Sequence, residues 1–320
     1  MENQEYKVKQ IYPAHADHIS HYKEKDIAKI FSESQVIVQR KYDGERMLIH
    51  FNGKETYCTS RRFSKKTGRY MENQDKILNL PCLEKLGYTV IDCEAYCDTW
   101  SESASILHSL PERAKELQLT TPLKFAAFDC LFFDGVDVRE KPYSERLNYV
   151  HKLLNILNYT LNDFRFHFPD QFLVDNINAA MKLAQEYWNN GYEGLVMKPL
   201  SYKYYDVGMM LKIKRFETVD VVVYDYKQGT GKYSDTVGAL LVGYYEPETD
   251  RIVHLSKVNC RTDADRDYWK QQFNNNSAIG KVLEVKCQEV TDKSLRHPVY
   301  IRIRDDKNYT MCTKDTIFKA

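Results

Sequence analysis

One stretch constrains this chain more than any other: Gln39-Arg40-Lys41-Tyr42-Asp43-Gly44-Glu45-Arg46, which lies between an apolar run and an alternating one. Lys41 therefore ends one expected strand, and Arg46 begins another. Lysine attacks only as the neutral amine, so a nucleophilic Lys41 would need its pKa lowered by burial or by cations such as Arg46. Asp43 could accept a hydrogen bond from a hydroxyl, Arg46 could bind a phosphate with its fork, and Gly44 permits a tight turn. Taken alone, however, the stretch fits an exposed charged turn better.

The composition is that of a globular protein. The 320 residues are 43% hydrophobic and 28% charged, with a formal net charge of +1, which suits two domains. No apolar run approaches membrane-spanning length and no signal peptide opens the chain, so we expect a cytoplasmic protein with no membrane partner. The eight cysteines form no Cys-x-x-Cys pair, which favours reduced core residues over disulfides or a zinc site.

Local charge patterns offer two candidate sites. Because the net charge excludes a diffuse polycation, nucleic-acid binding would need a local patch. One such patch consists of Arg61, Arg62, Lys65, Lys66 and Arg69. A solvated charged loop is the alternative interpretation there.

Three histidines near the start, His15, His18 and His21, could suggest a metal. No fourth ligand lies near them in the sequence. We therefore expect a short polar surface segment up to about residue 34.

Turn and periodicity signals predict an α+β first domain. Asn52-Gly53 lies between alternating runs and predicts a hairpin that joins 47–51 to 55–59 and brings Lys41 near Arg61. Asp175 is the expected N-cap of the second helix below, and Gly191 its stop. The other expected strands are 88–96, 123–133, 194–198 and 210–214, and the expected amphipathic helices, to which we assign no chemistry, are 144–157 and 175–190.

The pattern changes after Glu217 to short strands separated by turns. The expected elements are strands at 219–226, 237–245, 252–258, 282–290 and 299–303, with one helix at 263–273. Five strands with an inserted helix favour a small barrel such as an OB-fold, and a sandwich is the alternative. We therefore expect one domain over 1–216 and a second over 217–320.

The first stretch resembles the first motif of the covalent nucleotidyltransferases, and specifically of the ATP-dependent DNA ligases, Lys-Tyr-Asp-Gly-x-Arg. Further blocks follow in the order of that family and cover most of the chain, although Cys93 replaces the usual glycine of the third motif. The blocks are Thr59-Ser60-Arg61-Arg62, Val90-Ile91-Asp92-Cys93-Glu94-Ala95, the segment 125–135, Glu193-Gly194-Leu195-Val196-Met197-Lys198, Leu211-Lys212-Ile213-Lys214 and the segment 296–307, which resembles the sixth motif, Arg-x-Asp-Lys. The resemblance implies an adenylation (nucleotidyltransferase) domain of antiparallel sheets and helices, followed by an OB-fold barrel.

The resemblance also implies roles around ATP. Lys41 would be the nucleophile, and Lys198, Lys212 and Lys214 would neutralise the α-phosphate. Alternation along the strand points Lys212 and Lys214 to the same face. Glu94 and Glu193 would hold Mg²⁺ or Mn²⁺. The remaining implied nucleotide contacts are Gln39, whose amide oxygen would read adenine, Phe128, which would stack on the purine, Arg46 and Arg61, and Arg304 and Lys307, which would orient the pyrophosphate.

The implied reaction is the sealing of nicks in duplex DNA. Lys41 would take AMP from ATP, pass it to the 5′-phosphate at a nick, and the 3′-hydroxyl, aided by Asp43, would then expel AMP. Arg46 and Arg61 would hold the DNA, with Arg62 and the lysines at 65 and 66 as further contacts. The chain resembles the compact ligases of viruses, phages and some bacteria, and we expect it to act as a monomer.

Several other functions share part of this pattern. An mRNA capping guanylyltransferase would share the two-domain plan, but Tyr42 and the Glu45-Arg46 ending favour a DNA ligase. The common RNA ligases lack an OB domain with the last motif, and NAD⁺ as donor would call for zinc-finger cysteines and a further N-terminal domain. A catalytically inactive nucleic-acid-binding module is disfavoured, because it would have no use for Lys41 beside Asp43.

Overall fold

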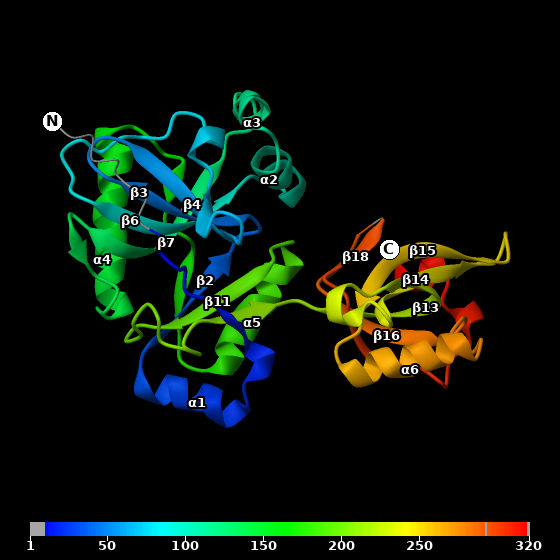
Figure 1. Cartoon of the computed structure of the whole chain (residues 1–320). Coiled ribbons are helices and arrows are strands. Elements are labelled where there is room, and N and C mark those ends of the chain that lie inside the picture. Colours follow the sequence, from blue (N-terminus) through cyan, green and yellow to red (C-terminus); the bar gives the residue numbers. More distant parts are fainter. Residues whose placement is uncertain (1–9, 292, 319–320) are drawn as a thin grey trace. The chain divides into compact units, whose positions relative to one another are not determined.

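The computed structural model describes residues 10–291 and 293–318, and residues 1–9, 292 and 319–320 lie outside the described part (Figure 1). The described residues form two compact units, one ending at Lys214 and the other beginning at Arg215. This division falls two residues before the expected boundary between 216 and 217. In the part of the chain that is described, no helix has the length and apolar character needed to cross a membrane.

The first unit is built on two sheets. The strand order of the first sheet is β1 (Asp17–His18), β12 (Leu211–Lys214), β11 (Gly194–Pro199), β2 (Val36–Lys41) and β10 (Gln171–Val174). The order of the second sheet is β5 (Arg69–Glu72), β4 (Thr56–Ser64), β3 (Glu45–Phe51), β6 (Thr89–Tyr96), β7 (Lys124–Phe133) and β8 (Val136–Asp137), and β9 (Phe166–His167) also pairs with β7. The helices and short helical turns are η1 (Ile19–His21), α1 (Glu24–Glu33), η2 (Gln74–Lys76), α2 (Trp100–Leu107), α3 (Pro111–Leu117), α4 (Tyr143–Asn155), the π-helical turn η3 (Ile156–Thr160) and α5 (Ile177–Asn189).

Each sheet buries one face and turns the other toward its partner. Helices α1 and α5 cover one face of the first sheet (Figure 1), where Val38 packs with Ile27 and Ala184. Helices α2, α3 and α4 supply apolar side chains to the core on one face of the second sheet, around Met47 and Ile49. Because side chains alternate along a strand, the polar residues of both sheets lie on the two opposite faces. The candidate site occupies the space between those faces.

The expected hairpin is confirmed. Met47 pairs with Ser60 and Phe51 with Thr56 across β3 and β4. The turn is closed by the Asn52 side chain, whose Oδ1 accepts from the backbone N–H of Glu55 at 2.8 Å.

Two local expectations are corrected. Asn176, not Asp175, is the N-cap of α5, and its side chain accepts from Ala179 N–H at 3.0 Å. The segment before residue 34 is not merely a surface lead-in, since it contains β1 and α1. Ile27 and Ile30 are one helical turn apart and both buried; so narrow an apolar stripe is easily missed among charged neighbours.

The second unit is a closed barrel with strand order β13 (Glu217–Gln228), β14 (Val237–Glu246), β15 (Arg251–Asn259), β19 (Val299–Ile303) and β16 (Val282–Cys287). The other elements are η4 (Gly231–Tyr233), α6 (Asp263–Asn274), the ribbon β17 (Glu289–Thr291) and β18 (Ser294–Arg296), η5 (Tyr309–Met311) and α7 (Lys314–Ile317). A capping box of Thr262 and Asp265 starts α6, and its Trp269 is fully buried in the barrel core. The prediction of a barrel is confirmed and the sandwich alternative is wrong.

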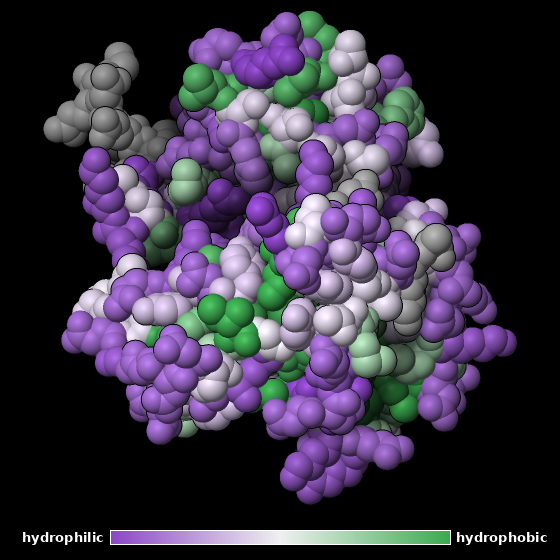
Figure 2. Space-filling model, turned by 90° about the vertical axis from the view of Figure 1, so that its right-hand side faces the viewer, coloured by the Kyte–Doolittle hydropathy of each residue, from purple (hydrophilic) through white to green (hydrophobic). Residues whose placement is uncertain are grey.

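The molecular face in Figure 2 is mainly hydrophilic, with apolar side chains in small separate groups.

Candidate active site

Strand register brings the expected catalytic lysines together. Gly194 on β11 pairs with Lys41 of β2 on one side and with Lys214 of β12 on the other. Directly paired residues project to the same face of a sheet, so the two lysines flank Gly194 on the inner face. A Cβ at Gly194, whose φ is +142°, would collide with the carbonyl oxygen of Ile213, and only glycine fits this row.

Lys41 is held by a carboxylate. Its Nζ lies 2.6 Å from the Oε2 of Glu193, and Lys214 binds the other oxygen of the same carboxylate. Burial by itself lowers the pKa of Lys41, but the charges of Glu193 and Glu94 outweigh burial, and the pKa is raised above its ordinary value. The expectation that nearby cations lower this pKa is therefore wrong for the structure as described. Lys41 is protonated here and must lose its pairing with Glu193 before it can attack.

Positive charge is in excess beside this pair. The described residues offer Lys212 no ion-pair partner, and burial together with Lys214, Lys41 and Arg61 lowers its pKa. Partial burial and the charges of Arg46, Arg61 and Lys212 likewise lower the pKa of His15. Crowded like charges of this kind repel each other unless an anion lies among them. The cluster is therefore suited to a polyphosphate.

Glu94 projects from β6 toward the same place. It pairs in register with Arg46 of β3. Burial raises the pKa of Glu94 to about 7, an effect that the charge of Lys41 opposes and that of Glu193 reinforces. Two mutually repelling carboxylates beside a buried lysine are an arrangement that a divalent cation would stabilise.

Arg46 does not offer its fork to a phosphate. Its Nε donates to the Oδ1 of Asp92 at 2.8 Å, its Nη2 also bonds Asp92 and the Tyr204 hydroxyl, and its Nη1 donates to the carbonyl oxygen of Ala14. Because Asp92 is fully buried, it needs this paired cation. The expected nucleotide and DNA contacts of Arg46 are not available in this arrangement, in which Arg46 joins β3 to β6.

Lys198 lies further from Lys41 along the sheet than Lys212 and Lys214 do. It pairs with Ile37 in register, four positions along β2 from Lys41. It is buried, its Nζ lies 3.1 Å from the Tyr143 hydroxyl and 4.5 Å from the centre of the Phe128 ring, and burial lowers its pKa to about 7. The implied contact of Lys198 with the α-phosphate stays a prediction, and in the structure the side chain lies against Tyr143 and Phe128.

The expected base-binding residues lie next to Lys198 and Tyr143. Phe128 is half-buried, and the guanidinium of Arg46 lies 5.3 Å from its ring centre. Gln39 is 2% exposed, and its Oε1 already accepts from the Tyr143 hydroxyl at 3.0 Å. Stacking by Phe128 and adenine recognition by Gln39 stay predictions, and the second would require Tyr143 to release that oxygen.

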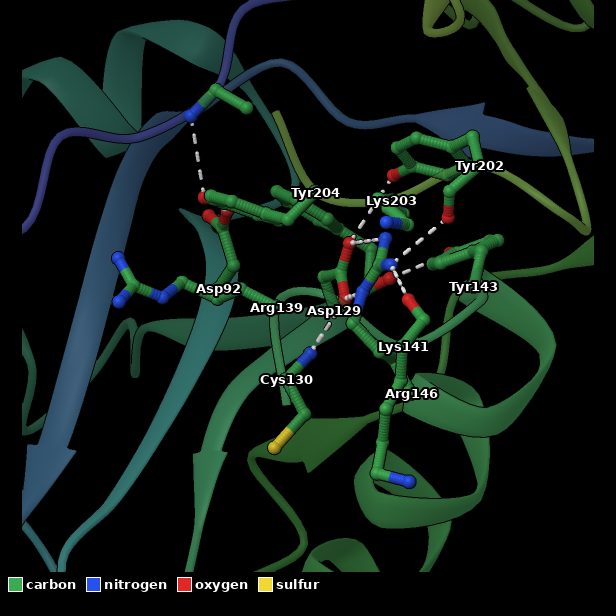
Figure 3. Close-up of polar contacts among 12 residues, drawn as sticks. Asp92, Asp129, Cys130, Arg139, Lys141, Tyr143, Arg146, Tyr202, Lys203 and Tyr204 are labelled. Atoms are coloured by element: carbon green, nitrogen blue, oxygen red, sulfur yellow. Dashed lines mark hydrogen bonds and ion pairs between the residues drawn. The ribbon is translucent and has the colours of Figure 1, made fainter. Parts of the chain in front are cut away.

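A buried polar network behind Phe128 was missed by the sequence analysis. Arg146 of α4, fully buried, donates to both oxygens of Asp129 at 2.8 and 3.1 Å and to the carbonyl oxygens of Lys141 and Tyr202 (Figure 3). The Tyr202 hydroxyl also donates to Asp129 at 3.2 Å. The network fixes the strand next to Phe128, so α4 contributes to the site that it was expected only to support. The available signal was the place of Arg146 on the apolar stripe of α4, one turn after Tyr143 and one before Val150.

Glycine at position 44 serves a different purpose from the expected tight turn. A Cβ there would collide with the carbonyl oxygen of Ala95 on β6. Asp43 is half-buried, and its charge helps to raise the pKa of Lys41. A role for Asp43 with the 3′-hydroxyl stays a prediction.

The four expected DNA-binding cations between positions 61 and 66 separate into groups. Arg61 is exposed, and its charge helps to lower the pKa of Lys212 and of His15. It therefore lies near the active-site cations. Arg62 instead pairs with Glu45 at 2.7 Å, away from that cluster. Lys65 and Lys66 are exposed in the turn between β4 and β5. Only Arg61 is therefore grouped with the lysines.

Arg304 and Lys307 belong to the second unit. Both bind Asp220 of β13, at 3.0 and 2.9 Å, and Arg304 also binds Asp306 at 2.9 Å. Three charged residues of the last motif are thus ordered against the barrel. Their predicted contact with pyrophosphate would require Asp220 to share them.

Comparison with known proteins identifies the family. A model described as the ATP dependent DNA ligase domain matches residues 16–214. The chain therefore belongs to the ATP-dependent DNA ligase family. It is 25% identical to a DNA ligase of Sulfurisphaera tokodaii over 88% of this chain and 54% of that protein, and 29% identical to a probable DNA ligase of Aquifex aeolicus over 68% of this chain and 38% of that protein. The chain thus spans about half the length, or less, of these relatives.

Solved structures support the same fold. A Lig E DNA ligase structure has a TM-score of 0.65 and 21% identity and covers 92% of this chain and 99% of that chain. The ATP-dependent DNA ligase of bacteriophage T7 in complex with ATP has a TM-score of 0.52 and 16% identity and covers 91% of this chain and 98% of that chain. At such identities the likeness concerns the fold alone, and it agrees with the expected α+β architecture.

Proposed function

We propose that this chain seals 3′-hydroxyl/5′-phosphate nicks in duplex DNA with ATP, through AMP carried on Lys41. The observation that carries the proposal is the row of Lys41, Gly194 and Lys214 on three neighbouring strands, with Glu193 between the two amines. Membership of the ATP-dependent DNA ligase family supports the same reaction.

The residues fit ATP as the substrate. Lys212 and Arg61 provide positive charge beside Lys41 that the described carboxylates do not neutralise, and a triphosphate would relieve the repulsion. The half-buried ring of Phe128 offers an apolar surface for the base.

The residues also fit a divalent cation. Among the described residues, no group of three or more His, Cys, Asp or Glu side chains could hold a metal alone. Mg²⁺ commonly binds one or two carboxylates together with substrate phosphates and water, and Glu94 and Glu193 would supply those carboxylates. Once bound, the cation would provide charge neutralisation at the reacting phosphate.

The proposed first step starts from release of Lys41 by Glu193. Burial, which lowers the pKa of the amine, is then less opposed, and Nζ gives its proton to solvent. Nζ attacks the α-phosphorus, the N–P bond forms, and the bond to pyrophosphate breaks. Lys212 and Lys214 neutralise the charge that develops on the phosphate oxygens. Arg304 and Lys307 are proposed to orient the leaving pyrophosphate.

In the two remaining steps the nick supplies the reacting groups. An oxygen of the 5′-phosphate displaces Lys41 from the AMP phosphorus, and the 3′-hydroxyl then attacks the activated 5′-phosphate and expels AMP. Asp43 would accept the proton of that hydroxyl, and Arg61 would hold the DNA backbone near the lysines. The barrel is proposed to be an OB-fold, and the protein a monomer acting inside the cell.

The proposal is tested with three nucleotide donors in parallel. The protein is incubated with Mg²⁺ and α-labelled ATP, GTP or NAD⁺, denatured, and examined for retained label; undenatured samples are then chased with nicked DNA or nicked RNA. We expect label from ATP alone and its discharge as sealed DNA. Label from GTP would indicate a capping guanylyltransferase, discharge on RNA alone an RNA ligase, and no label from any donor a binding module.

A further inference from the structure

Four aromatic side chains gather on the outside of the first unit and form what we call the aromatic platform: Tyr12, Phe63, Tyr70 and Tyr205. Three of them are strongly exposed, Tyr12 by 52%, Phe63 by 55% and Tyr205 by 40%. Single exposed aromatic residues are ordinary on protein surfaces, but a contiguous group marks an interaction site. The reaction proposed above gives this group no role.

The platform is built from three separate segments of the chain. Phe63 of β4 pairs directly with Tyr70 of β5, and their rings lie 5.3 Å apart edge to face. The Tyr12 ring lies 6.4 Å from that of Tyr70, and the Tyr205 hydroxyl donates to the carbonyl oxygen of Tyr12 at 3.0 Å. The Gln10 side chain accepts from the backbone N–H of Tyr70 at 2.6 Å. These contacts fix the rings without covering them.

Exposed cations border the platform. Lys65 and Lys66 stand in the turn that joins the two strands carrying Phe63 and Tyr70, and neither has an ion-pair partner among the described residues. Arg69 is 44% exposed in its side chain and, among the described residues, forms an ion pair with Glu72 of its own strand at 3.2 Å. The surface is therefore both aromatic and positively charged.

The platform adjoins the candidate active site. The Tyr12 ring lies 5.2 Å from that of His15, whose pKa is lowered by partial burial and by the charges of Arg46, Arg61 and Lys212. A strand that leaves the phosphate-binding cations on this side would thus pass over the platform.

The combination of rings and cations selects one kind of ligand. Aromatic rings stack on bases whose faces are open, while lysine and arginine contact the phosphates between them. In an intact duplex the base faces are covered by neighbouring bases. We propose that the aromatic platform binds unpaired nucleotides of single-stranded DNA, such as a gap or overhang next to the joined ends. The inference rests on the proposed function only in taking DNA as the nucleic acid.

Fluorescence anisotropy with a labelled oligothymidylate and with a blunt duplex of equal length tests the proposal over a range of salt concentrations. Phe63→Ala and Tyr12→Ala should each weaken binding of the single strand about tenfold at every salt concentration, because stacking is not ionic. Lys65→Ala should instead make the negative slope of the logarithm of the association constant against the logarithm of the salt concentration less steep, by about 0.7. Phe172→Ala is the matched control, since Phe172 is 43% exposed on β10 and contacts Tyr187 instead of the platform. It should change neither quantity.

Two results would overturn the proposal. Unchanged single-strand affinity in Phe63→Ala and Tyr12→Ala, with melting temperatures like that of the wild type, would remove the platform as a binding site. Equal weakening for the duplex would mean that the rings contact paired DNA. Failure of the proposed function would be separate, because it would appear as absent labelling of the wild-type protein by ATP, whatever its affinity for the single strand.

Discussion

The ammonium group of Lys41 and the carboxylate of Glu193 form an ion pair of 2.6 Å, and the second oxygen of that carboxylate binds Lys214. One buried carboxylate thus holds two lysines that the proposed reaction needs on a phosphate. The pair keeps the nucleophile protonated, because the charge of Glu193 helps to raise the pKa of Lys41. The proposed attack of Lys41 on ATP therefore requires that its ion pair with Glu193 be broken.

Replacement of Glu193 by glutamine should lower the pKa of Lys41. Burial lowers this pKa, and Glu193 and Glu94 together raise it, so removal of one charge leaves burial less opposed. We expect a decrease, measured by NMR titration of ¹³C-methylated lysines and assigned with Lys41→Arg. Glu186→Gln, on the exposed side of α5, should cause no shift. An unchanged or higher pKa in Glu193→Gln would contradict the account of the pair.

Lys198 should make stability depend on pH. Its pKa is lowered from 10.5 to about 7 in the folded protein. Between these values the unfolded chain binds a proton that the folded chain does not, so this group makes stability rise with pH from about 7 to 10.5. Compared with Lys198→Met, the wild type should gain up to roughly 5 kcal/mol across that range. Urea unfolding at several pH values measures the difference, and parallel curves for the two proteins would exclude a neutral buried Lys198.

The buried pair of Arg146 and Asp129 should be costly to break. Both side chains are almost fully buried, and the loss of one partner leaves the other charge without compensation. Arg146→Met should therefore cost about 3–5 kcal/mol of unfolding free energy in urea, and a second change, Asp129→Leu, should recover part of that loss. Arg113→Gln, in an exposed pair with Glu116, should have little effect. A loss for Arg146→Met as small as this control would show that the pair is dispensable.

Gly194 and Gly68 provide a matched comparison of two glycines. Alanine at Gly68, with φ +65° and nothing within 4 Å of the new Cβ, should cost only the conformational strain of about 1–2 kcal/mol. Alanine at Gly194 also meets the backbone of Ile213 and should separate β11 from β12, so that both stability and ATP-dependent labelling are lost to a larger extent. Thermal melts and labelling of the two variants measure this. Equal effects would mean that the lysine row tolerates displacement.

The individual strands of the fold were largely predictable because each carries its own alternation. Four barrel strands and α6 were expected close to their observed bounds, and the Asn52-Gly53 signal identified a real hairpin. The expected strand 282–290 is instead divided into β16 of the barrel and β17 of the separate ribbon. In contrast, β10 pairs with β2 at the edge of the sheet and leaves Phe172 and Leu173 exposed. Local sequence gives little indication of such a strand, because its pairing partner lies far away in the chain.

The site was predictable in its residues but not in its pairings. Motif order brought out Lys41, Glu193 and Lys214, which the structure places in contact. Sequence spacing could not show that Arg46 is bound to Asp92 or that Lys198 lies beside Phe128. Those contacts depend on how the two sheets pack against each other. The pattern of residues along a single strand does not determine that packing.

The measurement that tests the central claim most directly is the mass-spectrometric mapping of bound AMP after incubation with ATP and Mg²⁺. The account predicts AMP on the nitrogen of Lys41, lost on exposure to nicked DNA, and no modified peptide in Lys41→Arg. AMP on another residue, or its persistence on the protein when Lys41 is replaced, would contradict it.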